Sequence, residues 1–476
     1  MKVLFCASEA LPFSATGGLA DVAGSLPQAL RARLIGCRVV VPLYDSTPQE
    51  LRDQMKFITS ISVPVAWRRQ YCGIFEAKVG NVIYYLIDNQ YYFKRQGLYG
   101  HFDDAERFAF FSRAILEMLP YIDFKPDVIH TNDWQTALVP IYYRLFYANN
   151  EWYSGIKTLF TIHNIQYQGQ YGKDILEDVF GIPNYEAPLL EYDNCVNLMK
   201  GGIECANWVS TVSPTYAQEI LDPWFAHRLD PILRERSWKL SGILNGIDTV
   251  SYDPAADPNI YAHYSREDKA GKAENKRKLQ ERLCIEQDPD LPLIGMVTRL
   301  VSHKGLDLVK EGIDNVMTYS NAQFVVLGSG DLEYENFFRW MQERYPGRFV
   351  LCLGFVPELS RKIYAGADIF LMPSKSEPCG LSQMIAMRYG TIPIVRETGG
   401  LKDTVLDAGD PSGEGDGYTF KTYNAHDMLG ALDRAVGAYH LPEVWQGLQK
   451  RAMTKDFSWG RSAAQYIELY KGLLEA

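Results

Sequence analysis

Residues 291–308 read LPLIGMVTRLVSHKGLDL. The apolar run Leu293–Val297 is short and bounded by Pro and Thr, which is typical of a buried β-strand. It is followed by a polar loop, Thr298–Gly305, that leads into a helical pattern. A strand that passes through a loop into a helix is the repeating unit of a parallel sheet covered by helices. The stretch therefore predicts an α/β fold.

The same unit recurs through both halves of the chain. Amphipathic segments such as Ala105–Leu119, with apolar residues at helical intervals, separate short apolar runs. Because the pattern runs through the first half and restarts at Leu293, we expect two doubly wound parallel-sheet domains. The expected strands are Val3–Cys6, Arg38–Val41, Val82–Ile87, Asp127–His130, Thr158–Ile162 and Val209–Val212, then Leu293–Val297, Phe324–Leu327, Phe349–Leu353, Ile369–Met372 and Ile392–Val395.

The length of 476 residues also favours two domains, since one hydrophobic core rarely grows so large. The turn dipeptide Asn245-Gly246 marks the expected boundary. We predict an N-terminal domain over residues 1–244, a C-terminal domain over 245–457, and a last segment, 458–476, whose helix packs back on the first domain. The Pro- and Asp-rich stretch Asp253–Asp268 reads as a linker or surface loop.

The composition limits the partners. The net charge of −10 disfavours a nucleic-acid partner, and an anionic substrate would need a locally cationic pocket. No apolar stretch has the length of a signal peptide core or a membrane span, so we expect a cytoplasmic protein with no membrane partner. The eight cysteines are scattered without CxxC or zinc spacing, which predicts free thiols and no metal.

Two loops of the second half carry charge at predicted strand ends, where open parallel sheets bind ligands. Arg299 and Lys304 form a plausible diphosphate clamp, although a solvated basic loop is the alternative. Glu377, in the loop after Ile369–Met372, offers a carboxylate suited to sugar hydroxyls. The segment Thr398–Leu401 adds paired glycines after Ile392–Val395.

The first half places polar groups at equivalent positions. Gly17-Gly18 lies between a strand and a helix, where backbone N–H groups can approach an anion, although such glycines are often structural. The motif is not GxGxxG, so the dinucleotide fingerprint is absent. HTNDWQ (residues 130–135) and TIHNI (residues 161–165) each follow a strand, and a lone His in such a motif is often a satisfied structural residue.

Taken in order, these motifs resemble those of the bacterial glycogen synthase and plant starch synthase family. The family comprises retaining glucosyltransferases of the GT-B fold, in which two Rossmann-like domains face each other across a deep cleft. The resemblance spans the whole chain and rests on TGGLADV, HTNDWQTAL, FTIHNIQYQG, TVSPTYAQEI, LSGILNGID, TRLVSHKGLDL, LGSGD, SEPCGLSQ, ETGGLKDTV and the terminal FSW.

The resemblance implies ADP-glucose as donor, the non-reducing end of an α-1,4-glucan such as glycogen, starch or a maltooligosaccharide as acceptor, and no cofactor or metal. It implies an oxocarbenium-like transition state in which the leaving phosphate assists deprotonation of the acceptor. The implied catalytic residues are Glu377, Arg299, Lys304, His163 and Asp133. The implied donor-binding residues are Gly17, Gly18, Asp21, Asn164, Asn245, Phe355, Cys379, Gly380, Leu381, Thr398, Gly399 and Gly400, and Trp134 and Tyr167 fall on the acceptor side.

The chain departs from the family pattern at two positions. Many members carry Lys before the glycine pair, where this chain has Ala15, and the second glutamate of the wider GT-B signature is replaced by Ile385. Three alternatives stay open: a GT-B transferase with a small acceptor, a non-catalytic glucan-binding relative, and a nicotinamide oxidoreductase, which the missing GxGxxG disfavours. The sequence leaves ADP-glucose against UDP-glucose and the oligomeric state undecided.

Overall fold

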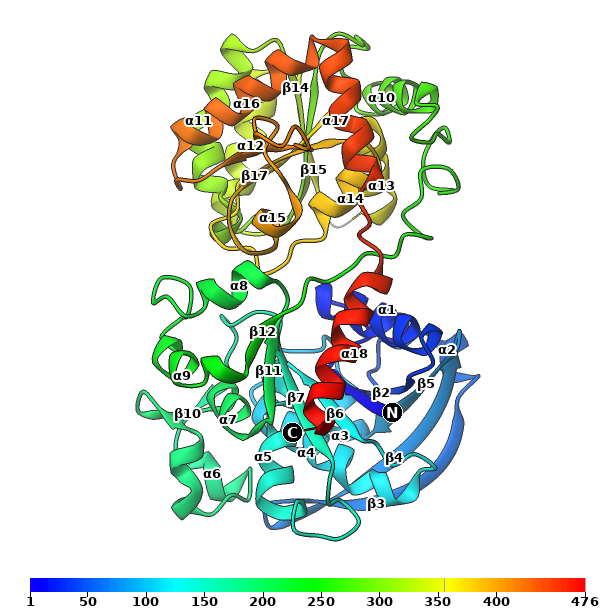
Figure 1. Ribbon diagram of the computed structural model, residues 1–476, viewed down its shortest axis with the longest axis vertical. Coiled ribbons are helices and arrows are strands. Elements are labelled where there is room, and N and C mark those ends of the chain that lie inside the picture. The colour runs from blue at the N-terminus through cyan, green and yellow to red at the C-terminus, as the bar shows by residue number, and fades with distance from the viewer. Residues whose placement is uncertain (355, 476) are drawn as a thin grey trace. The chain divides into compact units, whose positions relative to one another are not determined.

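The structure is a computed structural model that describes residues 1–354 and 356–475. The chain divides into two compact units. Figure 1 colours the chain from blue at the N-terminus to red at the C-terminus. Unit 1 comprises Met1–Gly246 and Trp459–Ala476, and unit 2 comprises Ile247–Ser458. The final helix, α18 (Trp459–Glu475), thus belongs to the unit formed by the first half of the chain.

Unit 1 is built on a nine-stranded sheet with the order β12-β11-β7-β6-β1-β2-β5-β4-β3. All neighbours are parallel except β3–β4 and β4–β5, which are antiparallel. The strands are β1 (Lys2–Cys6), β2 (Gly36–Pro42), β3 (Lys56–Val65), β4 (Arg68–Val79), β5 (Val82–Asp88), β6 (Val128–Asn132), β7 (Lys157–Ile162), β11 (Trp208–Thr211) and β12 (Leu240–Gly242), with a small separate sheet of β8 (Gln170–Tyr171), β10 (Cys195–Asn197) and β9 (Glu191–Tyr192).

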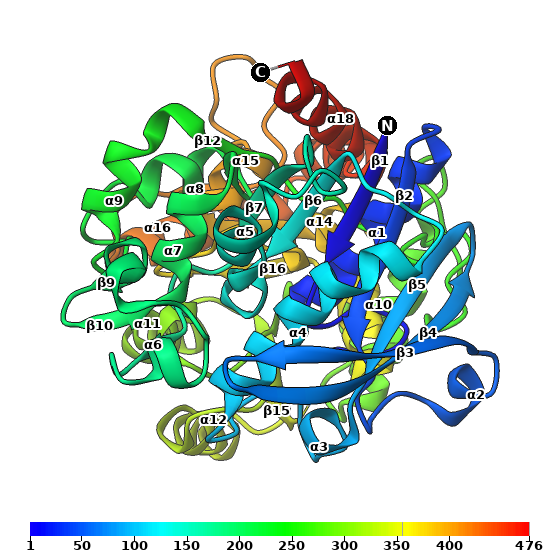
Figure 2. The same ribbon diagram turned by 90° about the horizontal axis from the view of Figure 1, so that it is seen from below.

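The helices of unit 1 surround this sheet, as Figure 2 shows from below. Helix α1 follows β1, and α4 lies between β5 and β6 in the sequence. The helices are α1 (Gly18–Ala32), α2 (Gln49–Arg52), α3 (Gln90–Phe93), α4 (Asp104–Met118), α5 (Leu138–Tyr142), α6 (Ile175–Asp178), α7 (Leu198–Cys205), α8 (Pro214–Glu219) and α9 (Asp230–Glu235), besides α18.

Unit 2 has one six-stranded, all-parallel sheet with the order β15-β14-β13-β16-β17-β18. Helices cover its two faces, with α11, α12 and α16 in one group and α10, α13 and α14 in the other (Figure 1). The elements are α10 (Ala270–Arg282), β13 (Leu293–Val297), α11 (Leu306–Tyr319), β14 (Gln323–Gly328), α12 (Leu332–Arg344), β15 (Phe349–Leu353), α13 (Pro357–Gly366), β16 (Ile369–Met372), α14 (Ser382–Arg388), β17 (Ile392–Arg396), α15 (Gly399–Thr404), β18 (Tyr418–Phe420), α16 (Ala425–Tyr439) and α17 (Pro442–Thr454).

The strand order identifies each sheet as Rossmann-like. In unit 2, β13 is the first strand of the chain in its sheet and lies between β14 and β16, which gives the doubly wound order 3-2-1-4-5-6. In unit 1 the same order is followed once the antiparallel β3 and β4 are set aside, with β12 added as a further strand beyond β11. The point where the chain reverses its direction of travel lies between β1 and β6 in unit 1 and between β13 and β16 in unit 2. Ligands of such sheets bind at this switch point, beyond the carboxyl ends of the strands.

The sequence patterns missed two of the strands that widen the sheet of unit 1. β3 and β4 form a long antiparallel ribbon whose residues are mostly half-buried or exposed. Their apolar and polar residues are mixed, whereas the expected strands are continuous apolar runs. A continuous apolar run predicts only strands that are buried on both faces, so it does not predict a ribbon at the edge of a sheet.

Helix α18 is fixed to unit 1 by both packing and hydrogen bonds. Its residues Trp459, Ala463, Tyr466 and Tyr470 join the core formed by β1, β2 and α1. The Tyr470 hydroxyl lies 2.7 Å from Nδ1 of His130, whose Nε2 lies 2.7 Å from the Thr161 hydroxyl. His130, which heads the HTNDWQ motif, is therefore a buried core residue of β6.

The stretch Asp253–Asp268, expected as a linker or surface loop, is anchored to unit 2. Asp257 is 1% exposed and accepts hydrogen bonds from Arg361 at 3.0 Å and Tyr389 at 2.5 Å. The Tyr264 hydroxyl donates to the Tyr389 carbonyl at 2.7 Å. The segment contains few apolar residues, so its sequence does not predict burial. It is anchored instead by the buried ion pair between Asp257 and Arg361.

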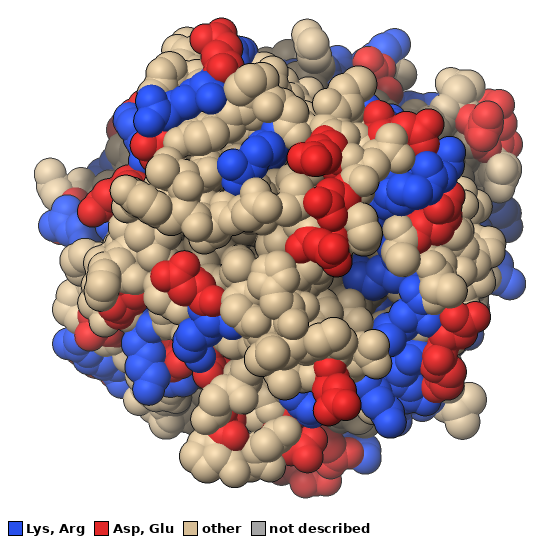
Figure 3. Space-filling view, turned by 90° about the horizontal axis from the view of Figure 1, so that it is seen from above, with Lys and Arg blue, Asp and Glu red and all other residues tan. Residues whose placement is uncertain are grey.

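The outer surface carries charges of both signs, as the numbers of basic and acidic residues in the sequence lead one to expect. Figure 3 shows Lys and Arg interspersed with Asp and Glu over the face that it displays. Within the described residues, no helix has the combination of length and apolar character that crossing a membrane requires.

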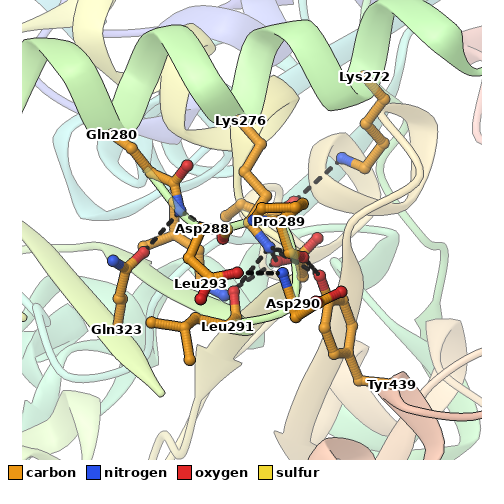
Figure 4. Close-up of polar contacts among 12 residues, drawn as sticks. Lys272, Lys276, Gln280, Asp288, Pro289, Asp290, Leu291, Leu293, Gln323 and Tyr439 are labelled. Carbon is orange, nitrogen blue, oxygen red and sulfur yellow. Dashed lines mark hydrogen bonds and ion pairs between the residues drawn. The ribbon is translucent and has the colours of Figure 1, made fainter. Parts of the chain in front are cut away.

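A buried polar cluster fixes α10 to the amino-terminal end of the sheet of unit 2 (Figure 4). Lys272, Lys276 and Gln280 lie four residues apart, so they share one face of the helix. The Lys276 ammonium lies 2.8 Å from a carboxylate oxygen of Asp368 and donates to the Leu291 carbonyl at 2.6 Å. The Asp368 carboxylate in turn accepts from the backbone N–H of Leu293, the first residue of β13.

Replacing Lys276 by Met should destabilise unit 2 by about 3–5 kcal/mol, because Asp368 would remain buried without its cation. The matched control is Lys278→Met on the exposed side of the same helix, where the side chain is 39% exposed and pairs with Glu281. That control should change the free energy of unfolding by less than about 0.5 kcal/mol. Urea unfolding of both variants measures the difference, and equal effects would contradict the role of the Lys276–Asp368 pair.

Candidate functional site

The loops that flank the switch point of unit 2 carry its charged candidates. The loop after β13 contains Arg299 and Lys304, and the loop after β16 contains Glu377. The backbone N–H of Lys375 donates to the His303 carbonyl at 2.9 Å. Gly305 has a φ of +75°, and a Cβ there would lie 2.0 Å from the Pro373 carbonyl oxygen. The two loops are therefore held in direct backbone contact.

This contact brings Lys304 and Glu377 together, 73 residues apart in sequence. The Lys304 ammonium lies 2.7 Å from Oε2 of Glu377, and the Ser374 hydroxyl donates to the same oxygen at 2.9 Å. Burial raises the pKa of Glu377, but the charge and hydrogen bond of Lys304 outweigh it and hold the pKa below its usual value. Oε1 of Glu377 has no hydrogen-bond partner among the described residues, so it can accept a bond from a ligand hydroxyl.

Arg299 differs from Lys304 in having no such partner. Its side chain is exposed, and among the described residues its guanidinium makes no hydrogen bond or ion pair. An unpaired guanidinium beside a Lys at a switch point can bind an anion such as a phosphate in bidentate fashion.

The remaining candidates of unit 2 form a tightly packed frame around Glu377. Gly399 has a φ of +44°, and a Cβ there would lie 2.0 Å from the Glu377 carbonyl oxygen. The backbone N–H of Gly400 donates to that carbonyl at 3.1 Å. The glycine pair after β17 therefore packs against the Glu377 backbone, and Thr398, directly before it, is fully buried.

Gln383 braces the same loop from α14. Its side-chain amide donates to the carbonyls of Cys379 at 3.1 Å and Gly380 at 2.9 Å. Leu381 lies directly before α14 and is half-buried. Ile385, at the place of the second family glutamate, is buried in α14. Phe355 lies outside the described residues.

In unit 1, the switch-point loop after β6 places Asp133 against the loop after β7. Asp133 has a φ of +58°, and its Oδ1 accepts from the backbone N–H of His163 at 2.8 Å and of Asn164 at 3.4 Å. Burial raises the pKa of Asp133 to about 7, although these two hydrogen bonds favour the charged form. The three residues that the sequence motifs singled out therefore form one connected group.

The tautomer of His163 follows from its neighbour. The side-chain N–H of Asn132 donates to the Cys6 carbonyl at 2.9 Å, which turns the Asn132 oxygen toward His163. Nε2 of His163 lies 2.8 Å from that oxygen and must donate to it. Burial lowers the pKa of His163 to about 3, so the ring is neutral at physiological pH and Nδ1 is a hydrogen-bond acceptor.

Among the described residues of unit 1, no atom would clash with a Cβ added to Gly17 or Gly18. A Cβ on Gly18 would meet no atom within 4 Å, and the nearest atom to one on Gly17 is 3.9 Å away. Gly17 caps α1 without a side-chain hydrogen bond, so the first amides of the helix are open to an anion. Asp21 lies in the first turn of α1, and Ala15 is exposed and supplies no charge.

The other candidates of unit 1 lie nearby in sequence or at the end of the unit. The indole of Trp134 packs edge-on against Phe108 and Tyr171, and a Cβ on Gly169 would lie 2.7 Å from it. Tyr167 is half exposed. Asn245 is 6% exposed, and its Oδ1 has no hydrogen-bond partner among the described residues. Such an unsatisfied oxygen is expected where a ligand supplies the donor.

The sequence motifs missed three residues that hold these groups in place: Ser374, Asn132 and Glu9. Asn132 lies within HTNDWQ and Ser374 lies two residues before SEPCGLSQ, and both are uncharged neighbours of charged candidates. Glu9 is a carboxylate in the mostly apolar stretch directly after β1, and like its neighbours it is buried. An acidic residue in such a stretch was the available signal.

Comparison with known proteins assigns the chain to a family. Residues 2–235 match the model described as the starch synthase catalytic domain, and residues 280–446 match glycosyl transferases group 1. Glycogen synthases of Bacillus cereus (strain B4264) and Bacillus anthracis are 49% identical, each alignment covering 100% of both chains. The glycogen synthase of Geobacillus stearothermophilus is 50% identical over 100% of this chain and 98% of its own. The chain belongs to the glycogen synthase family.

Solved structures agree with this family assignment. The catalytic domain of starch synthase IV from Arabidopsis thaliana, solved with ADP and acarbose, is 36% identical with a TM-score of 0.92, covering 100% of this chain and 99% of that one. A sucrose-phosphate synthase from Thermosynechococcus elongatus shares the fold at 17% identity and a TM-score of 0.61, with coverage of 100% and 99%. This member of the glycogen synthase family is thus a glycosyltransferase with the two Rossmann-like domains of the GT-B fold, as the sequence predicted.

Replacing Lys304 by Met should make the stability of this family member fall as the pH rises. In the native chain the pKa of Glu377 is lowered, so the pair stabilises the fold at neutral pH and loses that contribution as the pH falls through the folded pKa. In the variant burial, the largest influence on Glu377, outweighs the remaining bond from Ser374 and raises this pKa, so stability is lost as the pH rises above the unfolded value.

Melting temperatures at about pH 5 and about pH 8 measure the effect, with about 2–4 °C expected for each kcal/mol lost. The control is Lys310→Met on α11, which removes an exposed pair with Glu333. Adding Glu377→Gln to Lys304→Met should abolish the pH dependence. The same melting shift at both pH values would contradict the pairing.

Proposed function

We propose that the chain transfers glucose from ADP-glucose to the non-reducing end of an α-1,4-glucan with retention of configuration. Family membership over the full length supports the glucan acceptor, and ADP in the similar starch synthase IV structure supports the nucleotide. The observation that carries the proposal is the switch point of unit 2, where Arg299, Lys304 and Glu377 combine anion-binding and hydroxyl-binding groups.

In the proposed division of labour, unit 2 binds the donor. Arg299 and Lys304 hold the diphosphate and stabilise the charge that develops on the leaving ADP, which is the electrostatic role that a metal plays in other transferases. Oε1 of Glu377 accepts a hydrogen bond from a glucose hydroxyl, while Ser374 and Lys304 fix Oε2. The backbone of Cys379–Leu381 and of Thr398–Gly400 frames the sugar, and Phe355 is proposed against the base.

Unit 1 is proposed to supply uncharged side chains, backbone amides and the carboxylate of Asp21. Nδ1 of His163 and the side chain of Asn164 accept or donate bonds to glucose hydroxyls, with Asp133 holding both backbone amides in place. We assign Gly17, Gly18, Asp21 and Asn245 to the donor, and Trp134 and Tyr167 to the acceptor. We propose that the two units are the two domains of the enzyme, with the boundary at Asn245-Gly246. The free cysteines favour a cytoplasmic location.

The transition state is proposed to be oxocarbenium-like, with the leaving phosphate accepting the proton of the attacking glucan hydroxyl. No side chain is then required as a general base. Glu377 is unsuited to that role, because its charge is already neutralised by Lys304 and its pKa lies below the usual value.

Incubation of the protein with ADP-glucose or UDP-glucose and a maltooligosaccharide tests the proposal, with nucleotide release and chain length followed together. We expect one ADP released for each glucose added. A preference for a hexose phosphate as acceptor would instead support a small-acceptor transferase. Glucan binding without any nucleotide release would support a non-catalytic relative.

Arg299→Ala should lower kcat by about 10²–10³-fold, the usual effect of removing one preorganised charged donor. Because the Arg299 side chain is exposed and unpaired among the described residues, its loss should leave the melting temperature unchanged. The control is Arg277→Ala on α10, an exposed Arg that pairs with Glu274 at 2.8 Å. Turnover of Arg299→Ala within about threefold of the native rate would contradict the diphosphate assignment.

A further inference from the structure

Glu9 is a buried carboxylate that the catalytic assignment leaves without a role. It lies three residues after the end of β1, at the switch point of unit 1, and is 3% exposed. Its Oε2 accepts two hydrogen bonds from one residue, from the backbone N–H of Thr16 at 2.6 Å and from the Thr16 hydroxyl at 2.7 Å. The backbone of Gly17 also hydrogen-bonds this carboxylate.

The segment that Glu9 holds has few other anchors. Upstream, the backbone N–H groups of Phe13 and Ser14 donate to the Ala10 carbonyl, and Phe13 packs on Tyr84 at 5.0 Å. Residues 15–18 are exposed, and among the described residues no side chain other than Glu9 hydrogen-bonds them. The placement of the turn that enters α1 therefore depends on Glu9.

The surroundings of Glu9 make this an unusual place for a carboxylate. Burial raises its pKa to about 7, the bonds from Thr16 lower it, and the nearby carboxylate Asp21 raises it again. Glu9 in turn raises the pKa of Asp133. The bonds from Thr16 and Gly17 are thus the interactions that favour the charged form.

We propose that Glu9 is a positioning residue of the transferase: by fixing Thr16 it holds the Gly17–Gly18 turn where the first amides of α1 can bind the donor diphosphate. The proposal rests on the proposed function, since it assigns those amides to that donor. It also follows from Ala15. Without the Lys that many family members carry there, unit 1 can offer the diphosphate only backbone N–H groups from this turn, so their placement decides how well they bind.

The direct test is hydrogen–deuterium exchange of the ligand-free protein over residues 11–19, compared between the native chain and Glu9→Ala. We expect faster exchange in this segment alone, because the Thr16 amide loses its acceptor. The readout needs no substrate, so it stands even if the donor proves to be another nucleotide sugar. Unchanged exchange in this segment would overturn the proposal.

Kinetics with ADP-glucose and a maltooligosaccharide separate positioning from a general loss of structure. Glu9→Ala should raise the donor KM about tenfold and leave the glucan KM unchanged. Thr16→Val, which loses only the hydroxyl bond, should raise the donor KM about threefold, and Thr16→Ser should restore it. The double variant Glu9→Ala/Thr16→Val should have the same donor KM as Glu9→Ala alone, because the bond from the Thr16 hydroxyl is already lost when Glu9 is removed.

The controls keep the two claims distinguishable. If the native chain does not use ADP-glucose, the proposed function fails, while the exchange result still decides the role of Glu9. If Glu9→Ala does not fold, Thr16→Val and Thr16→Ser carry the test. Equal rises in donor and glucan KM in Thr16→Val, or no rescue by Thr16→Ser, would overturn the positioning role.

Discussion

A buried carboxylate must be compensated, and in unit 2 this requirement organises the candidate site. Glu377 lies in the loop after β16, and the loop after the neighbouring strand β13 brings the cation of Lys304 to it. The close backbone approach of Gly305 to Pro373 and the bond from Lys375 to His303 bring Lys304 within 2.7 Å. Lys304 and Ser374 thus hold Oε2, and Oε1 keeps its capacity to accept a hydrogen bond from a ligand.

The two units share the doubly wound strand order but place different chemical groups at their switch points. Each has its candidate residues at the switch point of a doubly wound sheet, where strand-end loops diverge. Unit 2 offers positive side chains, Arg299 and Lys304. Unit 1 offers a neutral His163, two carboxylates with raised pKa values, Glu9 and Asp133, and open helix amides. Ala15 strengthens this contrast, because a Lys there would have added a cation to unit 1.

Sequence patterns predicted the architecture well because both domains are built from short apolar strands. Leu293–Val297, Phe349–Leu353 and Ile369–Met372 have the bounds that were expected. The same patterns do not predict the ribbon β3–β4, because half-exposed edge strands mix polar and apolar residues. His130 was grouped with the polar motif, yet it lies in the core, since its hydrogen bonds to Tyr470 and Thr161 join residues distant in sequence.

The sequence motifs place the candidate residues at strand ends but do not give the contacts between them. Glycine pairs look alike in sequence, yet Gly399-Gly400 packs against the Glu377 backbone, whereas Gly17-Gly18 faces open space. The Lys304–Glu377 and Glu9–Thr16 contacts depend on loop geometry that no local pattern encodes. A crystal structure of the chain with ADP bound tests the central claim most directly. The account predicts the diphosphate within hydrogen-bonding distance of Arg299 and Lys304, and a nucleotide bound away from both would contradict it.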